Sequence, residues 1–290
     1  MSVAHPIIAV TGSSGAGTST VKNAFEDIFR RGDIKPVVVE GDSFHRFDRK
    51  EMQAEVLKAE AKGETLTHFG PKANCLDRLE ALFQNYAETG KGERRFYIHT
   101  NTKGLPFEQP AGTFTPWKQL DGVSDLLFYE GMHGGAVTDE INIARFVDLM
   151  IGVVPVMNLE WIQKIKRDCT NRGYSEEAVV DIILKRMPDY IHHITPQFSR
   201  THINFQRIPL IVTSNPFVMR EIPTDDESLV VIRFKNPKLA DFPYYLSMLK
   251  DSFMSRPNNI VIPATKMELA MEVILAPFVE EIMNKKRQSH

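Results

Sequence analysis

The chain has 290 residues, of which 42% are hydrophobic and 25% are charged, and its formal net charge is −2. This composition excludes a disordered or collagen-like protein and is typical of a globular protein with one large core or two modest ones. The small acidic excess argues against a nucleic-acid partner, because sequence-independent binding to phosphates needs a clear basic excess. An anionic substrate would therefore be bound by a local cluster of cations.

The first residues, "MSVAHPIIAVTG", lack the basic and apolar segments of a secretory signal, and no run of 18 apolar residues follows. We therefore expect a cytoplasmic protein with no membrane partner. Its cysteines, Cys75 and Cys169, have no CxxC or Cys/His metal spacing, so we expect both to be reduced.

Short β-branched runs alternate with helical patterns along most of the chain. The strands expected in chain order are "PIIAVTG", "KPVVVEG", "SDLLFYEG", "VDLMIGVVPV", "RIPLIVTS" and "SLVVIRF". Helices are expected over 18–31, twice within 50–92, and over 266–286. Continuous apolar strands that alternate with helices predict an α/β fold with a doubly wound, mostly parallel sheet and helices on both faces.

Two segments of the predicted fold lie outside this alternation. "RRFYIHT" and "PAGTFTPW" are expected as strands at a sheet edge, in a middle region that shapes substrate specificity. From Asn158 to about Tyr190 the pattern is helical and rich in charge, with Gly173 as a break and Ser175 as a helix cap. We predict a single domain over 1–290 with a helical lid at about 158–190.

The stretch "GSSGAGTST" lies between the first strand and the first helix. It has the phosphate-loop form G-x-x-x-x-G-K-[ST], except that Thr18 replaces the lysine. Backbone N–H groups and the helix dipole bind phosphate there even without a lysine, although a purely structural glycine turn is the alternative. Ser19, at the metal-binding hydroxyl position, favours phosphate binding. The expected ATP-binding residues are Gly12, Ser13, Ser14, Gly15, Ala16, Gly17, Thr18, Ser19 and Thr20.

Another cation must replace the missing lysine, which would neutralise charge on the β- and γ-phosphates. In "KIKRDCTNRG", Lys164, Arg167 and Asp168 are spaced i, i+3 and i+4 and share one helical face. A solvated helix with a local ion pair is the alternative, and the spacing alone favours it.

Acidic residues follow two of the predicted strands. Asp42 comes after "VVVEG", at the sheet edge where open α/β folds bind ligands, and is a candidate base for an attacking hydroxyl. Its alternative role is to cap a short helix. Glu130 ends "LLFYE" and is a candidate ligand for Mg²⁺.

Several basic side chains lie close to these acids in the sequence. His45 and Arg49 follow Asp42 closely enough to reach a second anion. His99 is either a substrate contact or a surface residue, and His133 is either part of the metal site or a satisfied loop histidine.

Longer stretches resemble the phosphoribulokinase family in its bacterial form, within the group that also contains uridine kinase. The resemblance runs over "HPIIAVTGSSGAGTSTV", "VEGDSFHRF", "LLFYEGMHGG", "GVVPVMNLEWIQKIKRD", "ITPQFSRTHINFQRIP" and "VVIRFKNP". It implies a P-loop kinase fold and phosphorylation of the C1 hydroxyl of ribulose 5-phosphate with ATP and Mg²⁺. The lid form R-D-x-x-x-R-G, from Arg167 to Gly173, is shared with uridine kinase-like proteins.

The resemblance also implies roles for individual residues. Asp42 matches the general base, Glu130 an acid that assists the metal, and Lys164 the lid cation that supplies the charge absent at Thr18. The implied catalytic residues are Asp42, Lys164, Arg167, Asp168 and Arg172, and the implied substrate contacts are His45, Arg49, His99 and Arg186.

This chain departs from the family at two positions. Lys185 precedes Arg186 in a basic pair of the lid, and lysine lacks the bidentate fork of arginine. Ala16 stands where the chloroplast form has a redox cysteine, so we expect no thiol switch. Bacterial members are similar in being homo-oligomers activated by NADH and inhibited by AMP, which implies an effector response at Arg233 and Arg256.

Two other functions remain open. The loop, Asp42 and the lid would serve a P-loop kinase of another sugar phosphate or of a nucleoside. His45 and Arg49 favour an acceptor that already carries a phosphate. The second open function is a nucleotide-sensing regulator that binds ATP without turnover. The presence of both Asp42 and Glu130 counts against this function.

Overall fold

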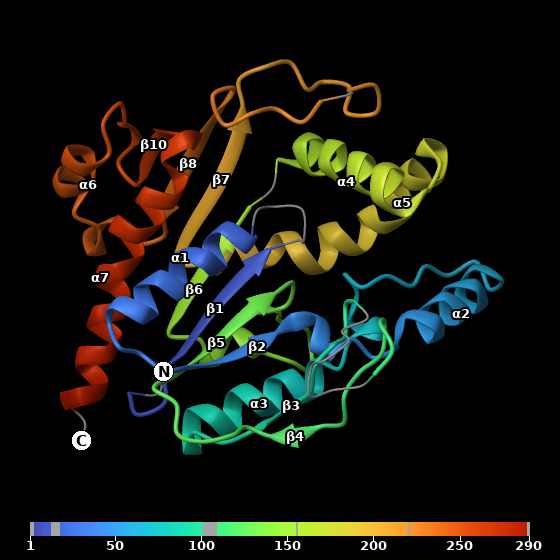
Figure 1. The fold of residues 1–290 in the computed structure, drawn as a ribbon, viewed down its shortest axis with the longest axis horizontal. Helices are drawn as coiled ribbons and strands as arrows, with labels where there is room; N and C mark the ends of the chain where they lie inside the picture. Colours follow the sequence, from blue (N-terminus) through green and yellow to red (C-terminus); the bar gives the residue numbers. More distant parts are fainter. Residues whose placement is uncertain (1–2, 13–17, 101–108, 155, 220, 289–290) are drawn as a thin grey trace.

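The computed structural model describes residues 3–12, 18–100, 109–154, 156–219 and 221–288. The strands of its large sheet are β1 (Ile7–Gly12), β2 (Pro36–Glu40), β5 (Leu126–Gly131), β6 (Leu149–Val153), β7 (Ile203–Pro209), β8 (Ser228–Phe234), β9 (Phe253–Arg256) and β10 (Asn259–Pro263). In the described part these eight strands have the order β2-β5-β1-β6-β7-β8-β10-β9 (Figure 1). From β2 to β7 they run parallel, and from β7 to β9 antiparallel. The predicted mostly parallel α/β sheet is confirmed.

Helices cover both faces of the parallel half. α1 (Thr18–Arg31) and α7 (Met267–Gln288) pack on one face, and α3 (Leu76–Thr89) packs on the other (Figure 1). In β1, Ile8 and Val10 join the cluster with α1 and α7, while Ile7 and Ala9 join the cluster with α3. Both faces of β1 are therefore buried, which explains its uninterrupted apolar sequence.

In the antiparallel half of the sheet, the strand expected over 207–214 lies earlier in the chain. β7 begins earlier, where Ile203 pairs with Ile151 of β6, and ends at Pro209, opposite Ser228 of β8. Residues 210–214 lie beyond the strand. β9 and β10 were not predicted, because both are short and only two residues separate them. The prediction relied on strands that alternate with helices, and no helix lies between these two.

The two segments expected as strands at a sheet edge, 94–100 and 110–117, lie outside the main sheet, and only Arg94 of them belongs to a strand. β3 (Glu93–Arg94) and β4 (Lys118–Gln119) pair with each other, and an isolated bridge joins Tyr97 to Phe114. The edge assignment was therefore wrong. The aromatic rings of Tyr97 and Phe114, 5.3 Å apart, pack together in this separate hairpin.

The predicted lid segment forms a helical hairpin of α4 (Met157–Arg172) and α5 (Glu176–Asp189). Gly173 ends α4 with a φ of 71°, and the Ser175 side chain accepts a hydrogen bond from Ala178 N, as the break and cap predicted. The hairpin lies near α2 (Arg49–Glu60), and Lys185 Nζ is 3.0 Å from Glu60 Oε1 (Figure 1). Among the described residues, no helix combines the length and apolarity needed to cross a bilayer.

Candidate active site

A pair of glycines fixes the backbone at the ends of β2 and β5. A Cβ added to Gly41 would lie 2.8 Å from the Cα of Gly131, and one added to Gly131 would lie 2.7 Å from the Cα of Gly41. Because only glycine fits such an approach, the two strand ends are held together. Asp42 follows one glycine and Glu130 precedes the other, so the two acids lie at the carboxyl ends of neighbouring strands.

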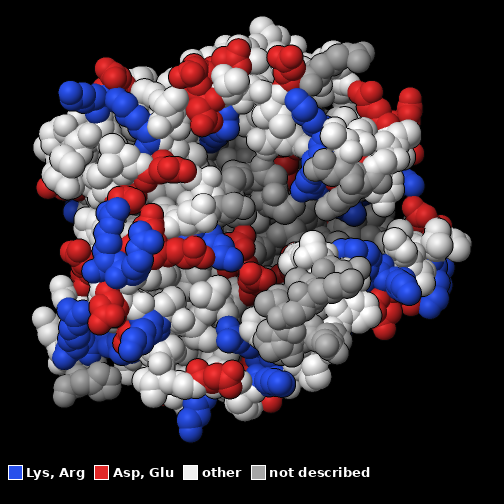
Figure 2. Space-filling view, viewed as in Figure 1, with Lys and Arg blue, Asp and Glu red and all other residues white. Residues whose placement is uncertain are grey.

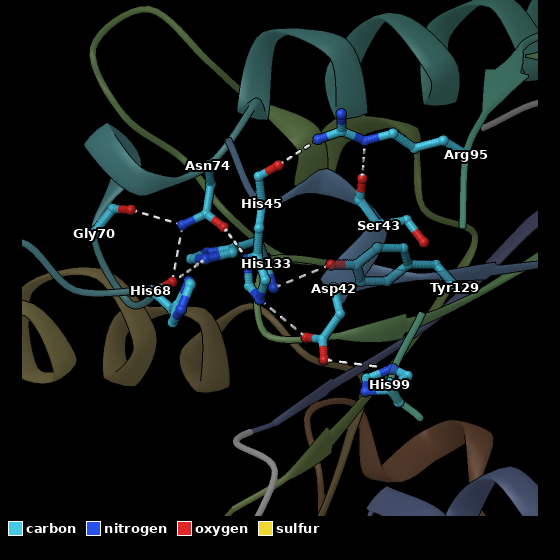
Figure 3. A network of polar contacts seen from close by, with 10 residues as sticks. All are labelled: Asp42, Ser43, His45, His68, Gly70, Asn74, Arg95, His99, Tyr129 and His133. Carbon is cyan, nitrogen blue, oxygen red and sulfur yellow. Dashed lines mark hydrogen bonds and ion pairs between the residues drawn. The ribbon is translucent and has the colours of Figure 1, made fainter. Parts of the chain in front are cut away.

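Asp42 lies within a 3-10 turn over Gly41–Phe44 and does not cap a helix, contrary to that alternative. His45 Nε2 is 3.2 Å from Asp42 Oδ1, and His99 Nε2 is 3.8 Å from Asp42 Oδ2 (Figure 3). Partial burial acts to raise the pKa of Asp42, but the hydrogen bond and charge of His45 and the charge of His99 lower it overall. The carboxylate is 44% exposed and thus accessible to a substrate.

Arg49 belongs to the same group of side chains. It begins α2, whose capping box is formed by Asp48 and Glu51, and its Nη2 lies 3.4 Å from the carbonyl oxygen of His99. The structure thus places His45 and His99 beside Asp42, and Arg49 beside the backbone of His99. Their assignment to substrate binding remains a prediction.

The phosphate-loop region is described only at its flanks. β1 ends at Gly12 and α1 begins at Thr18, as predicted, with Thr20 in the first turn of α1. Ser13, Ser14, Gly15, Ala16 and Gly17 lie outside the described residues, as do the side chains of Thr18 and Ser19.

Glu130 is the described candidate for a magnesium ligand. It pairs with Val10 of β1 and Glu40 of β2, one residue before β1 reaches Thr11 and Gly12. Its carboxylate is the type of donor that Mg²⁺ takes. The described residues contain no group of three or more His, Cys, Asp or Glu able to hold a metal.

The lid cations of α4 are joined by one buried acid. Asp168 is 3% exposed, and its two oxygens lie 2.5 Å from Lys164 Nζ and 3.0 Å from Arg167 Nε. Burial opposes ionisation of Asp168, but the hydrogen bonds from Lys164 and Arg167 lower its pKa overall. The contacts lie within one helix, as the alternative of a local ion pair predicted, but their carboxylate is buried and not solvated. Arg172 ends α4, and its side chain lies outside the described part.

The charge of Arg186, on α5, acts on Lys164 of α4 and on His68. Burial lowers the pKa of Lys164, and the charges of Arg186 and Arg167 act in the same direction. Arg186 also contributes to the low pKa of His68, about 3, which is due mainly to burial and then to the charge of His45. His68 stacks on His45 with ring centroids 4.1 Å apart, and His45 is the residue beside Asp42.

The surface over this region is hollowed. In the orientation of Figure 1, a depression lies between the lid hairpin and the carboxyl ends of the parallel strands (Figure 2). Basic and acidic side chains alternate around it without a broad field of either sign. An anion entering the depression would depend on individual cations, as the net charge of −2 indicates.

Comparison with known proteins identifies the relatives of this chain. The model of the "Phosphoribulokinase / Uridine kinase family" matches residues 7–214, which is more than half of the chain. The chain belongs to the phosphoribulokinase/uridine kinase family. The chromosomal phosphoribulokinase of Cupriavidus necator is 59% identical over 100% of this chain and 99% of that protein. The phosphoribulokinase of Nitrobacter vulgaris is 54% identical over 98% and 99%.

A solved structure of the phosphoribulokinase/uridine kinase family has the same fold. The phosphoribulokinase from Rhodobacter spheroides superposes with a TM-score of 0.90 at 53% identity, covering 99% of this chain and 100% of that one. The P-loop kinase fold expected from the sequence is therefore confirmed.

Arg233 and Arg256, for which the family resemblance implied an effector response, lie in the antiparallel half of the sheet. Arg233 of β8 and Arg256 of β9 both pair with Asn259 of β10, which lies between them. Both arginines are exposed. The sheet order separates them from β2 and Asp42, which lie at its other end.

Sequence reasoning missed the side chains that hold the turn after β2. His133 is 5% exposed, and its Nε2 lies 3.0 Å from the carbonyl oxygen of His68. This position favours a satisfied loop histidine over a residue of the metal site. Burial lowers the pKa of His133 to about 4. Asn74 binds main-chain oxygens of its own loop and the distant ring of His45, and Arg95 binds main-chain oxygens of a distant segment; no motif marks such partners.

Arg95 holds the turn that carries Asp42 through two hydrogen bonds. Its guanidinium donates to the carbonyl oxygens of Ser43 and His45 (Figure 3), and it lies over the rings of Phe114 and Trp117. Burial lowers the pKa of Arg95 without preventing its ionisation.

An Arg95→Lys variant is expected to lower kcat about 10-fold and the free energy of unfolding by about 1–3 kcal/mol. Lysine keeps the charge but cannot reach both carbonyls in the planar fork geometry. Steady-state kinetics and urea unfolding would measure the two effects. The control is Arg94→Lys, because Arg94 donates to a single carbonyl, that of Val38. Equal effects at both positions would contradict a special role for Arg95.

Proposed function

We propose that this protein is an ATP-dependent kinase that phosphorylates the C1 hydroxyl of ribulose 5-phosphate, giving ribulose 1,5-bisphosphate and ADP. The observation that carries the proposal is full-length similarity to phosphoribulokinases, at 59% identity, in a chain whose Asp42 lies beside His45 and His99, with Arg49 beside the backbone of His99. A carboxylate flanked by cations at a strand end suits an acceptor that has both a hydroxyl and a phosphate.

In the proposed reaction, Asp42 accepts the proton of the attacking hydroxyl, and its lowered pKa keeps it ionised for that purpose. Arg49 binds the phosphate of the acceptor, and His45 and His99 orient the sugar. The backbone at Gly12 to Thr20 binds the phosphates of ATP. Glu130 and Ser19 would hold Mg²⁺, which neutralises charge on the transferred phosphoryl group when bound.

The lid cations act on the transferred phosphoryl group in the same proposal. Lys164, with Arg167 and Arg172, takes the place of the loop lysine, and buried Asp168 holds Lys164 and Arg167 side by side. Arg186 faces the acceptor from the lid, as its influence on His68 supports. Positive charge aimed where negative charge develops lowers the barrier without needing a net basic surface.

Regulation and assembly are part of the proposal as well. We infer a cytoplasmic homo-oligomer in which NADH and AMP act as effectors at Arg233 and Arg256. The pairing of both arginines with Asn259 supports a common anion site on the exposed antiparallel strands. Enzyme assays with and without each nucleotide, and light scattering, would test these inferences.

Purified protein incubated with ATP, Mg²⁺ and a panel of acceptors tests the activity directly. The panel contains ribulose 5-phosphate, other pentose phosphates and uridine, and ³¹P NMR identifies the product. We expect ribulose 1,5-bisphosphate only when ribulose 5-phosphate is present. Phosphorylation of uridine instead would favour the nucleoside kinase alternative, and ATP binding without turnover would favour a regulator.

An Arg49→Ala variant is expected to raise the KM for ribulose 5-phosphate about 10-fold to 100-fold, the loss expected for a hydrogen bond to a charged group. The KM for ATP should hardly change. The matched control is Lys50→Ala, which removes the same charge from the next, exposed residue of α2. A similar rise in both KM values would mean that Arg49 supports the nucleotide site or the fold.

A further inference from the structure

Asn74 is a buried side chain that contacts the site from outside it. It is 1% exposed, and its backbone forms a bridge with that of His45. Its Nδ2 lies 2.8 Å from the carbonyl oxygen of His68 and 2.7 Å from that of Gly70 (Figure 3). Carbonyl oxygens only accept hydrogen bonds, so the amide nitrogen must face them. The orientation of the Asn74 amide is thereby fixed.

The fixed amide determines the proton on one nitrogen of His45. Asn74 Oδ1, which only accepts, lies 2.9 Å from His45 Nδ1. A hydrogen bond between these atoms requires a proton on Nδ1. His45 is itself buried, at 7% exposed, and stacked on His68, so water does not offer its ring another partner in this position.

The same ring orientation directs the other nitrogen at the base. His45 Nε2 lies 3.2 Å from Asp42 Oδ1 (Figure 3). With Nδ1 protonated, a neutral His45 would present a lone pair on Nε2 to an ionised carboxylate, and the contact would be repulsive. The contact is a hydrogen bond only if the Asp42–His45 pair holds one further proton between Nε2 and Oδ1.

We propose that Asn74 is a positioning residue for the kinase reaction, which fixes a proton on His45 Nδ1 and so aims Nε2 at Asp42. The inference rests on the proposed function, in which Asp42 is the base. With Oδ1 engaged by His45, Oδ2 is the oxygen that accepts the hydroxyl proton, on the side where His99 Nε2 lies 3.8 Å away. Orientation of a base by a histidine whose other nitrogen is fixed follows the general logic of outer-shell partners.

The tautomer of His45 can be read in the unmodified protein without substrate. Long-range ¹H–¹⁵N NMR of protein with ¹⁵N-labelled histidine distinguishes protonated from bare ring nitrogens, and a His45→Gln variant assigns the signal. We expect protons on both Nδ1 and Nε2, because Asn74 Oδ1 and an ionised Asp42 Oδ1 can each only accept a hydrogen bond. A bare Nδ1 would overturn the inference whatever the kinetics.

An Asn74→Leu variant tests the consequence for the reaction. It removes the acceptor, so we expect His45 to shift toward the form protonated only on Nε2. The kcat/KM for ribulose 5-phosphate should fall about 10-fold to 100-fold, as for outer-shell partners of functional histidines, at unchanged KM for ATP. Wild-type kinetics or an unchanged tautomer in this variant would contradict the role of Asn74.

A matched control separates this effect from simple anchoring of the loop. Arg46 donates to the carbonyl oxygens of Lys72 and Asn74 and so holds the same segment without touching the His45 ring. Arg46→Gln should leave the tautomer and the kinetics near wild type. A loss equal to that of Asn74→Leu would mean that loop anchoring alone matters.

A second variant covers the case in which Asn74→Leu does not fold. Asn74→Asp keeps an acceptor for Nδ1 but loses both donors, so His45 should stay protonated on Nδ1. Loss of that proton in the aspartate variant would overturn the inference. If the unmodified protein does not phosphorylate ribulose 5-phosphate, the proposed function fails, and the NMR result still decides the role of Asn74.

Discussion

An Asp42→Asn variant is expected to lower kcat by about 10²–10⁴-fold or more, while ATP binding hardly changes. The amide has nearly the same shape and can still accept the hydrogen bond from His45 Nε2, but it cannot take a proton from the acceptor hydroxyl. Steady-state kinetics with ribulose 5-phosphate would give kcat, and isothermal titration calorimetry would give the affinity for ATP. Asp42 follows the end of β2 and its side chain is 44% exposed, so the fold should tolerate the change.

The control for the lost negative charge is Asp139→Asn, which alters an exposed acid away from the strand ends. It should have the kcat of the unmodified protein. Near-normal turnover of Asp42→Asn would remove Asp42 from the mechanism, and the base would then have to be sought elsewhere in the site.

A Lys164→Met variant is expected to lower kcat by about 10²-fold or more, a loss of roughly 2.7 kcal/mol in transition-state stabilisation. Methionine keeps much of the stem and suits a helix, so mainly the charge is deleted. The affinity for ATP should stay nearly constant, because we propose that Lys164 acts on the transferred phosphoryl group more than on bound ATP. Lys166→Met is the matched control, since Lys166 is exposed on the same helix.

The buried acid beneath Lys164 makes this experiment specific. In the variant, Asp168 would keep Arg167 as its partner, so the lid helix should remain folded. Introducing Thr18→Lys into the variant need not restore activity, because a loop lysine would approach the phosphates along another path. Full kcat in Lys164→Met would reject the displaced cation and leave Arg167 or Arg172 as the next candidate.

The sequence predicted the parts of the fold that local pattern determines. The apolar runs of β1, β5 and β6 are buried on both faces and that of β2 mainly on one, and Gly173 and Ser175 act through their own backbone positions. The antiparallel strands were harder to predict. Whether β7 continues past Pro209 depends on its pairing with β8. Periodicity within one segment carries no information about a partner.

The candidate site was predictable where side chains follow strand ends. Asp42 and Glu130 were placed by the rule that ligands bind at carboxyl ends of parallel strands. Asn74 and Arg95 could not be found in this way, because Asn74 contacts the ring of His45 about 30 residues away and Arg95 donates to carbonyl oxygens about 50 residues away. Main-chain acceptors are present at every residue, so a sequence does not show which ones are used.

The order of strands in the large sheet also has a consequence for how the chain folds during synthesis. β1 leaves the ribosome before the other strands of the large sheet, yet its two neighbours are β5 and β6, which begin at Leu126 and Leu149. Until then the most buried strand has no pairing partner, and loops of more than one hundred residues must close around it. The nascent protein therefore passes through a long stage in which an apolar segment is exposed, and chaperone binding at Ile7–Gly12 would protect it from aggregation.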